Sequence, residues 1–156
     1  MKIQTLLSEE MIIPEIHSED RDSVLEEIVR FLKNKDRIRK DKDLFEKLIQ
    51  REKLGSTAIG DGIAIPHCKL KEAESPILVL AVSKKGVRFE ALDGKPTHIF
   101  FLVVSSPDDP GQSLQILASI AHLVRKAGGL PKKIMSAKSP RKILEVIREE
   151  EEKLEG

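Results

Sequence analysis

The sequence of 156 residues contains no tryptophan, no tyrosine and a single cysteine, and its opposite charges nearly cancel. One cysteine cannot form an intramolecular disulfide, so nothing indicates an oxidising compartment. The 27 Lys and Arg residues are balanced by 26 Asp and Glu residues, which removes the bulk attraction that nucleic acids and anionic membranes exert on basic proteins. The five Phe residues offer few rings on which bases can stack. We therefore expect no nucleic-acid partner.

Long apolar segments are also missing. The longest apolar runs, at residues 77–82 and 99–104, are far shorter than the roughly 20 residues that a helix needs to span a bilayer. The first ten residues lack the apolar region of a secretory signal. We expect a cytoplasmic protein with no direct membrane insertion. Residues 1–156 are predicted to form a single domain, large enough to fold without a disulfide or a metal.

Apolar spacing in the first half of the chain predicts two helices after a short strand. Residues 10–16 have the composition of a strand, and the acidic residues that follow begin a helix with apolar positions through residue 32. A second helix begins near Asp41 and is closed by Gly55. Residues 57–68 then alternate as a strand does, interrupted by a glycine turn.

The second half predicts central strands followed by helices. Residues 77–83 and 98–105 are continuous apolar runs of the kind found in strands covered on both faces, joined by an antiparallel ribbon. A long helix to about residue 126, a short helix at residues 131–137 and a last helix follow, and the acidic end of the last helix (residues 149–152) is expected to fray. The order predicts an α/β fold, with a mixed sheet of about five strands between helices on both faces.

Two short glycine motifs fail as nucleotide-binding signatures. Residues 60–62 would begin a dinucleotide fingerprint, but Ile65 occupies the place of its third glycine. Gly94 and Lys95 are followed by Pro96 and lack the upstream glycine of a phosphate-binding loop. Both are interpreted as turns, and no cofactor is predicted.

The four histidines do not follow a metal-binding pattern. They are far apart in the sequence, at His17, His67, His98 and His122. Metal sites usually take ligands at short fixed spacing, so no metal site is predicted. Cys68 adjoins His67, but neighbouring residues of a strand point to opposite faces and cannot share a proton. Cys68 is therefore interpreted as a small buried side chain.

His67 and Arg51 occupy unusual positions. Pro66 cannot donate to a sheet ladder, so His67 lies where a strand ends and its imidazole can meet a partner. In the preceding helix, Glu52 falls near the centre of the apolar stripe and Arg51 falls on its flank. These positions are compatible with a hydrogen-bonded histidine and a cation at a helix end, or with a site in which an arginine fork grips an anion.

A long motif includes both residues. Residues 51–67 read REKLGSTAIGDGIAIPH, and residues 86–89 and 91–96 read GVRF and ALDGKP. The chain closely resembles, over nearly its whole length, the fructose, mannitol and nitrogen-regulatory type (type 2) of enzyme IIA domain of the bacterial phosphoenolpyruvate-dependent phosphotransferase system. The resemblance implies the mannitol-type enzyme IIA fold.

The resemblance also implies roles for three residues. His67 would accept a phosphoryl group from the phosphocarrier protein HPr, and Arg51 would stabilise that group. Family members commonly have a second histidine at the start of the helix after the last strand, and Ser113 stands at that place here. His122 lies almost three turns further on and does not replace it. Cys68 stands where a small glycine is usual.

The leading hypothesis is a phosphotransferase component, a histidine phosphocarrier that takes the phosphoryl group from HPr and passes it to a IIB component. A second hypothesis is a nitrogen-type regulatory protein whose phosphorylation state controls a target protein. A third is a relative that has lost phosphotransfer, since the second histidine is missing. The sequence indicates no particular sugar.

Overall fold

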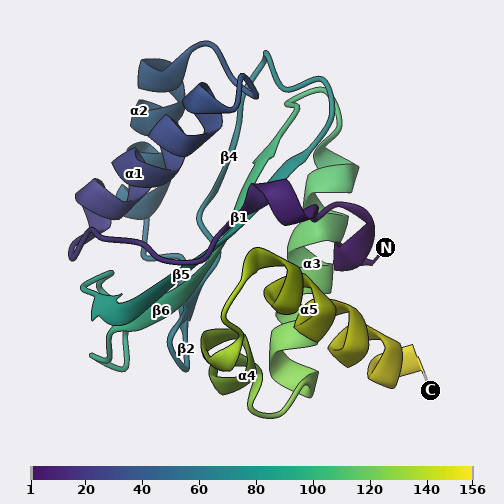
Figure 1. Cartoon of the computed structure of the whole chain (residues 1–156). Coiled ribbons are helices and arrows are strands. Elements are labelled where there is room, and N and C mark those ends of the chain that lie inside the picture. The colour runs from purple at the N-terminus through teal and green to yellow at the C-terminus, as the bar shows by residue number, and fades with distance from the viewer. Residues whose placement is uncertain (1, 156) are drawn as a thin grey trace.

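The computed structural model describes residues 2–155 and has a mixed β-sheet between two layers of helices (Figure 1). Helices cover both sides of the sheet (Figure 1). The first layer consists of α1 (Arg21–Asn34) and α2 (Asp41–Lys53). The second layer consists of α3 (Pro110–Lys126), α4 (Leu130–Ser136) and α5 (Pro140–Glu155). Two short 3₁₀ turns, η1 (Ile3–Thr5) and η2 (Glu9–Met11), precede the sheet. The predicted fold class is confirmed.

Within the described residues the sheet has six strands, one more than the sequence predicts. They are β1 (Ile12–Ile13), β2 (Ala58–Gly60), β3 (Ile63–Ala64), β4 (His67–Lys69), β5 (Ile77–Val87) and β6 (Thr97–Ser105). The order is β1-β5-β6-β3-β2, and β4 also pairs with β6. Strands β5 and β6 are antiparallel, whereas β3 and β4 run parallel to β6. The segment at residues 57–68 divides into three strands because a turn interrupts it and Pro66 has no N–H for the ladder.

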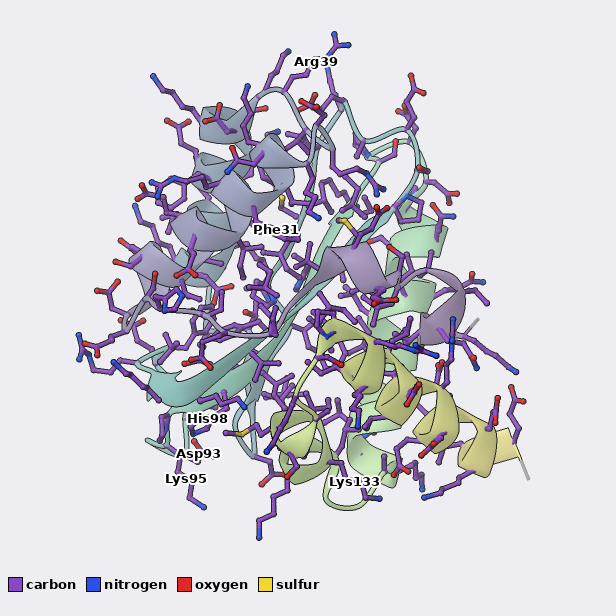
Figure 2. All side chains as sticks on the ribbon, viewed as in Figure 1. Phe31, Arg39, Asp93, Lys95, His98 and Lys133 are labelled. Carbon is purple, nitrogen blue, oxygen red and sulfur yellow. The ribbon has the colours of Figure 1, made fainter. Side chains whose placement is uncertain are left out.

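The core lies on both faces of β5 and β6. Residues 77–83 and 99–105 are buried throughout, as their unbroken apolar runs predict. Phe89 packs edge-on against Phe100, with 5.2 Å between the ring centroids. Figure 2 shows the side chains that fill the space between the sheet and its helices. Residues 63–66 are also all buried, so the alternation seen in the sequence of this segment does not correspond to one buried and one exposed face.

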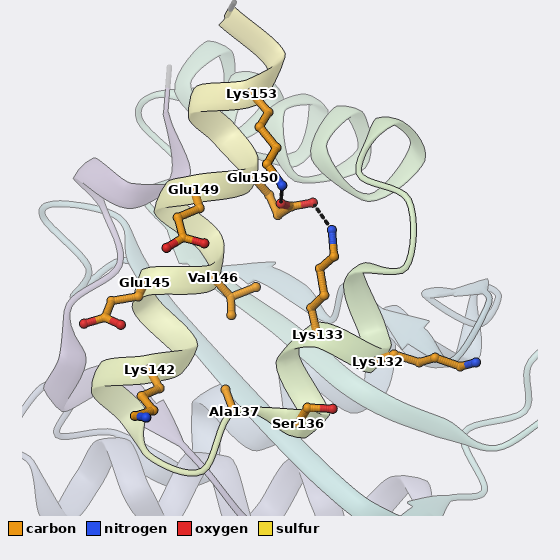
Figure 3. Close-up of a pocket in the computed structure, with 10 residues that line it drawn as sticks. All are labelled: Lys132, Lys133, Ser136, Ala137, Lys142, Glu145, Val146, Glu149, Glu150 and Lys153. Carbon is orange, nitrogen blue, oxygen red and sulfur yellow. Dashed lines mark hydrogen bonds and ion pairs between the residues drawn. The ribbon is translucent and has the colours of Figure 1, made fainter.

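The acidic end of α5 is anchored, and the prediction that it frays is wrong. The helix continues to Glu155, and the side chains of Glu150 and Glu151 are buried. The Glu150 carboxylate accepts hydrogen bonds from Lys133 Nζ at 2.9 Å and Lys153 Nζ at 2.8 Å (Figure 3). These two ammonium groups offset the unfavourable helix dipole at this end.

Glu151 joins the two ends of the chain. Its carboxylate accepts hydrogen bonds from the backbone N–H groups of Ile3, at 2.6 Å, and Gln4, at 2.8 Å. Both N–H groups lie at the start of η1, where no intrahelical partner exists for them. A buried N–H left without a partner is costly, so this carboxylate fixes the N-terminal turn against α5.

We therefore predict that Glu151→Ala lowers the free energy of unfolding by about 1–3 kcal/mol, since it leaves two N–H groups unpaired. Urea unfolding followed by circular dichroism measures this change. Glu152→Ala is the matched control, because Glu152 is an exposed neighbour on the same helix and should change stability by less than about 0.5 kcal/mol. Equal losses in the two variants would contradict the structural role of Glu151.

Candidate functional site

Arg51 and His67 meet at the edge of the sheet. Arg51 lies in the last turn of α2, and His67 is the first residue of β4. Arg51 Nε donates to His67 Nε2 at 3.3 Å, and Arg51 Nη1 donates to the carbonyl oxygen of Gly55 at 2.9 Å. On the other side of the ring, His67 Nδ1 lies 2.7 Å from the carbonyl oxygen of Ile65. The structure thus brings together the two residues that the sequence singled out.

These contacts determine the tautomer of His67. A carbonyl oxygen can only accept, so Nδ1 carries the proton and donates it to Ile65. In the neutral ring Nε2 then holds a lone pair, and this is the atom that faces Arg51. Burial lowers the pKa of His67 below its usual value; the hydrogen bond to Ile65 raises it, the charge of Arg51 lowers it and the charge of Glu52 raises it, with a net downward shift. The imidazole is therefore neutral near pH 7, with a nucleophilic nitrogen at Nε2.

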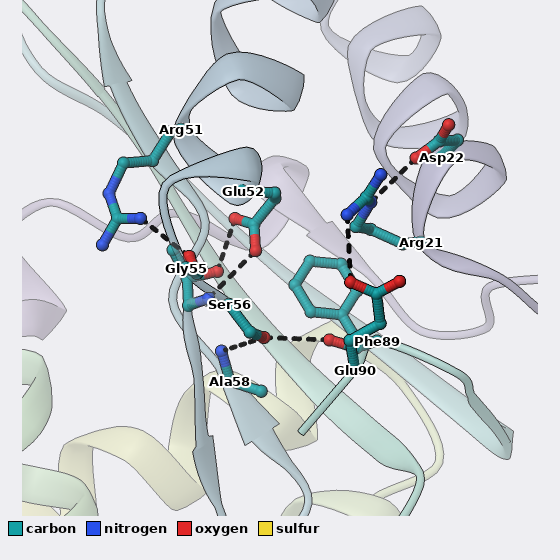
Figure 4. Close-up of polar contacts among 10 residues, drawn as sticks. Arg21, Asp22, Arg51, Glu52, Gly55, Ser56, Ala58, Phe89 and Glu90 are labelled. Atoms are coloured by element: carbon teal, nitrogen blue, oxygen red, sulfur yellow. Dashed lines mark hydrogen bonds and ion pairs between the residues drawn. The ribbon is translucent and has the colours of Figure 1, made fainter. Parts of the chain in front are cut away.

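A buried carboxylate holds the segment that follows Arg51. Glu52 is 3% exposed, and its oxygens accept hydrogen bonds from the N–H of Thr57 at 2.9 Å and from Thr57 Oγ1 at 2.6 Å (Figure 4). Gly55 lies inside the loop closed by these bonds, with a φ of +148° that a residue with a Cβ rarely adopts. Because the Gly55 carbonyl also holds Arg51, the Glu52–Thr57 contact positions the guanidinium.

Ser56 adds a further point of attachment. Its hydroxyl donates to the carbonyl oxygen of Phe89 at 2.9 Å and accepts from the N–H of Ala58 at 3.1 Å (Figure 4). The role of Thr57 as the partner of Glu52 was not predicted. The placement of Glu52 within an apolar helix stripe was the signal for it, because a buried carboxylate must find donors.

The two neighbours His67 and Cys68 face opposite sides of the sheet. The charges of Lys47 and Asp43, both on α2, act on the thiol of Cys68. Burial raises the pKa of Cys68 to about 12, which makes the thiol unreactive at neutral pH. Successive strand residues alternate, so the His67 ring and the Cys68 thiol point to different sides of β4, and the ring meets Arg51 at the end of α2.

Ser113 lies in the first turn of α3 and is buried. Its N–H is bonded to the carbonyl oxygen of Asp109, the N-cap residue of this helix, at 3.4 Å. Within residues 2–155 its hydroxyl makes no hydrogen bond to His67. The structure therefore joins His67 to Arg51 but does not join Ser113 to either, and a functional role for Ser113 stays a prediction.

The other histidines are outside this site. The His17 N–H donates to the carboxylate of Glu27, and His98 Nδ1 contacts the carbonyl oxygen of Ser83. His122 is exposed on α3. In the part of the chain that the structure describes, no three His, Cys, Asp or Glu side chains form a group that could hold a metal ion. None of the helices described is long and apolar enough to cross a membrane.

The fold is a mixed sheet between helices, and a histidine and an arginine meet at the edge of that sheet. Comparison with known sequences identifies the family that has these features. Residues 5–150 match the family model of the phosphoenolpyruvate-dependent sugar phosphotransferase system, EIIA 2. The chain belongs to this family.

Relatives come from two branches of the family. The chain is 31% identical over 149 residues to a fructose-specific EIIABC component of Bacillus subtilis, covering 96% of this chain but 23% of that protein. It is 32% identical over 147 residues to a nitrogen regulatory protein of Bradyrhizobium diazoefficiens, covering 94% of this chain and 95% of that protein.

Solved structures support the same fold. The nitrogen regulatory protein IIA-Ntr from Neisseria meningitidis superposes with a TM-score of 0.84 at 26% identity, covering 93% of this chain and 98% of that one. A mannitol IIA protein from Escherichia coli superposes with a TM-score of 0.75 at 17% identity, covering 90% of this chain and 98% of that one. The expected mannitol-type fold is thereby confirmed.

The charges beside His67 predict opposite effects of two adjacent substitutions. Arg51→Ala should raise the pKa of His67, because it removes a cation that disfavours the imidazolium. Glu52→Gln should lower that pKa, because it removes an anion that favours the imidazolium. NMR titration of the imidazole C–H signals measures both changes, with the signals of exposed His122 as an internal reference. Shifts in the same direction would contradict this electrostatic account.

The sign of the shift also predicts a pH dependence of stability. Because the pKa of folded His67 lies below the unfolded value of about 6.5, the unfolded chain takes up this proton first as the pH falls. Well above pH 6.5, titration of His67 therefore does not change the free energy of unfolding, and below pH 6.5 it lowers that free energy. Urea unfolding between pH 7.5 and 5 should show this loss in the parent protein and a smaller loss in His67→Gln.

Proposed function

We propose that this chain is a histidine phosphocarrier that accepts a phosphoryl group on Nε2 of His67. The observation that carries the proposal is the pair of contacts on the ring, because Ile65 fixes the proton on Nδ1 and leaves Nε2 as the nucleophile beside Arg51. In the transfer step the Nε2 lone pair forms a bond to phosphorus while the donor's N–P bond breaks. The bonding electron pair returns to the donor imidazole, which carries a proton on its other nitrogen and so leaves as a neutral ring. His67 keeps its Nδ1 proton and takes over the positive charge that the donor ring loses, so charge and atoms balance without a metal.

Arg51 supports the transfer electrostatically. A phosphoryl group carries roughly 1.5 to 2 negative charges at pH 7. At about 4 Å and an effective dielectric constant near 20, each unit of that charge gains about 4 kcal/mol of attraction to a guanidinium, before desolvation is counted. The planar fork of Arg51 can also donate to two oxygens at once. This attraction positions the group at the open edge of the sheet, from which it can leave again.

The proposed donor is a protein of the HPr type, and the proposed acceptor is a IIB component, in the cytoplasm. Membership of the EIIA 2 family supports this assignment. A second candidate is a regulatory protein whose phosphorylation state controls a target protein. The match to a nitrogen regulatory protein over 95% of that relative's length supports this second role. In both roles the phosphoryl group is carried by His67.

The central prediction is that phosphoenolpyruvate, enzyme I and HPr together add one phosphoryl group to this protein. Intact mass spectrometry should show an acid-labile adduct, which is absent in His67→Ala. Arg51→Ala should slow phosphorylation by about tenfold to a thousandfold, a loss of roughly 1.4 to 4 kcal/mol of transition-state stabilisation, while the thermal unfolding transition is retained.

Two outcomes would overturn this proposal. If the parent protein gains no adduct, the chain is a family member that has lost phosphotransfer. If an adduct persists in His67→Ala, another residue is the acceptor. Lys53→Ala is the matched control for Arg51, because Lys53 is an exposed cation two residues further along α2.

Ser113 can be tested by restoring the histidine that relatives commonly have. If this position borders the phosphoryl group, Ser113→His should speed transfer by about tenfold, the equivalent of one added hydrogen bond of about 1.4 kcal/mol. Stopped-flow kinetics with phosphorylated HPr measures the rate, and Ser113→Ala provides the baseline. Equal rates in a folded Ser113→His variant would remove Ser113 from the site.

A further inference from the structure

A cavity lies away from His67, where the turn between β2 and β3, the segment before β6 and the connection from α3 to α4 meet. Its volume is about 640 Å³. The polar side chains on its wall are those of Asp61, Lys95, His98, Arg125 and Lys132. Three of these are permanent cations and one is an anion. We call this space the basic cavity.

The cations of the basic cavity are not neutralised by the protein. Within residues 2–155, none of Lys95, Arg125 and Lys132 forms a salt bridge. Asp93 lies close by in Figure 2, but its carboxylate accepts a hydrogen bond from the backbone N–H of Lys95 at 3.0 Å. On the wall of the cavity the three cations outnumber the one anion, Asp61, and a concave surface with an excess of one charge concentrates counter-ions from solution. The cavity therefore favours an anionic occupant.

His98 adds an oriented polar group. Its Nδ1 lies 2.8 Å from the carbonyl oxygen of Ser83, so Nδ1 carries a proton and donates it. The ring is closely flanked by Gly62 and Gly86, and a Cβ at Gly86 would lie 3.1 Å from its Cε1 atom and 2.8 Å from the Cβ of Pro96. These contacts fix the ring. Its Nε2 has no hydrogen-bond partner among the described residues and borders the cavity.

The remaining wall is apolar and defines the rest of the ligand. It includes Ile63, Val124 and Pro131. Ligand sites of this size commonly pair an apolar surface with a few convergent polar groups. Inorganic ions would leave that surface unused. The combination suits an organic anion with a compact apolar body.

The basic cavity is distinct from the Arg51–His67 site. Along β6, Ile63 of the cavity wall is paired with Ile99, whereas His67 is paired with Val103. Four residues of a strand separate these positions, a distance of roughly 13 Å. A ligand in the cavity therefore does not need His67, and the two sites can be tested separately.

We propose that the basic cavity binds a small organic phosphomonoester, with its dianionic group among the three cations and its body against the apolar wall. The neighbouring cavity between α4 and α5 has no comparable excess of positive charge, because both lysines and glutamates line it. Two of those lysines, Lys133 and Lys153, are paired with Glu150 (Figure 3). The inference is independent of phosphotransfer, since it rests on the cavity alone.

Phenyl phosphate and inorganic phosphate are the probes for this proposal, because they share a dianionic group and differ in the apolar body. Titration of ¹⁵N-labelled protein with each should shift the amide signals of Gly62, Gly128 and Gly129, which line the cavity. Phenyl phosphate should bind about tenfold more tightly, because its ring covers the apolar wall. Arg125→Gln and Lys132→Gln should each weaken binding by about fivefold.

Two control variants separate the possible outcomes. Lys126→Gln removes an exposed cation next to Arg125 that does not line the cavity, and binding should be unchanged. Arg51→Ala should also leave the cavity shifts unchanged. The proposal is overturned if the cavity signals do not move, if Lys126→Gln weakens binding as much as Arg125→Gln, or if the shifts surround His67 and disappear in Arg51→Ala. Retained dispersion of the amide spectrum verifies that each variant is folded.

Discussion

Strand β6 pairs with β5 along one edge and with both β3 and β4 along the other, so the two halves of the sheet are joined through its backbone hydrogen bonds. Its residues 99–105 are buried, which keeps water from competing for those bonds. The strand also sets the position of each site. His67 pairs with Val103 of β6, and His98, near the start of β6, lines the basic cavity. A rigid central strand therefore separates two places where anions are proposed to bind.

The Arg51–His67 geometry depends in turn on the buried carboxylate of Glu52. Removing a carboxylate from water is expensive, and the N–H and hydroxyl of Thr57 offset that cost through two short hydrogen bonds. The resulting loop presents the Gly55 carbonyl that holds Arg51. Glu52 has a second effect, because its charge and that of Arg51 act on His67 in opposite directions. In the proposed transfer, the phosphoryl group brings its negative charge beside a cation that the Gly55 carbonyl already orients.

Patterns that repeat within a few residues made the helices and central strands predictable. The apolar stripe of α1 and the unbroken apolar runs of β5 and β6 are examples. In each, the spacing of apolar residues within a short segment predicts which side chains are buried. The site was reached partly through its motif and partly through the charge of Glu52 in an apolar stripe. Contacts between distant residues were beyond such reasoning: the partners of Glu151 are Ile3 and Gln4, almost 150 positions away. The helix dipole alone favours fraying of an acidic C-terminal turn, and the sequence pattern does not reveal the distant N–H groups that hold this one in place.

His67 and His98 illustrate how one side chain acquires different chemistry from its surroundings. Both rings bond a backbone carbonyl through Nδ1, so both present Nε2 as the available atom. For His67, that atom meets one guanidinium at 3.3 Å, and burial lowers the pKa of the ring, so Nε2 keeps the lone pair that the proposed transfer uses. For His98, the same atom borders a cavity with three cations and an apolar wall, where the proposed ligand is held by charge and by its contact with that wall. The two proposed phosphate sites therefore depend on local groups of cations, since the formal net charge of the whole chain is only +1.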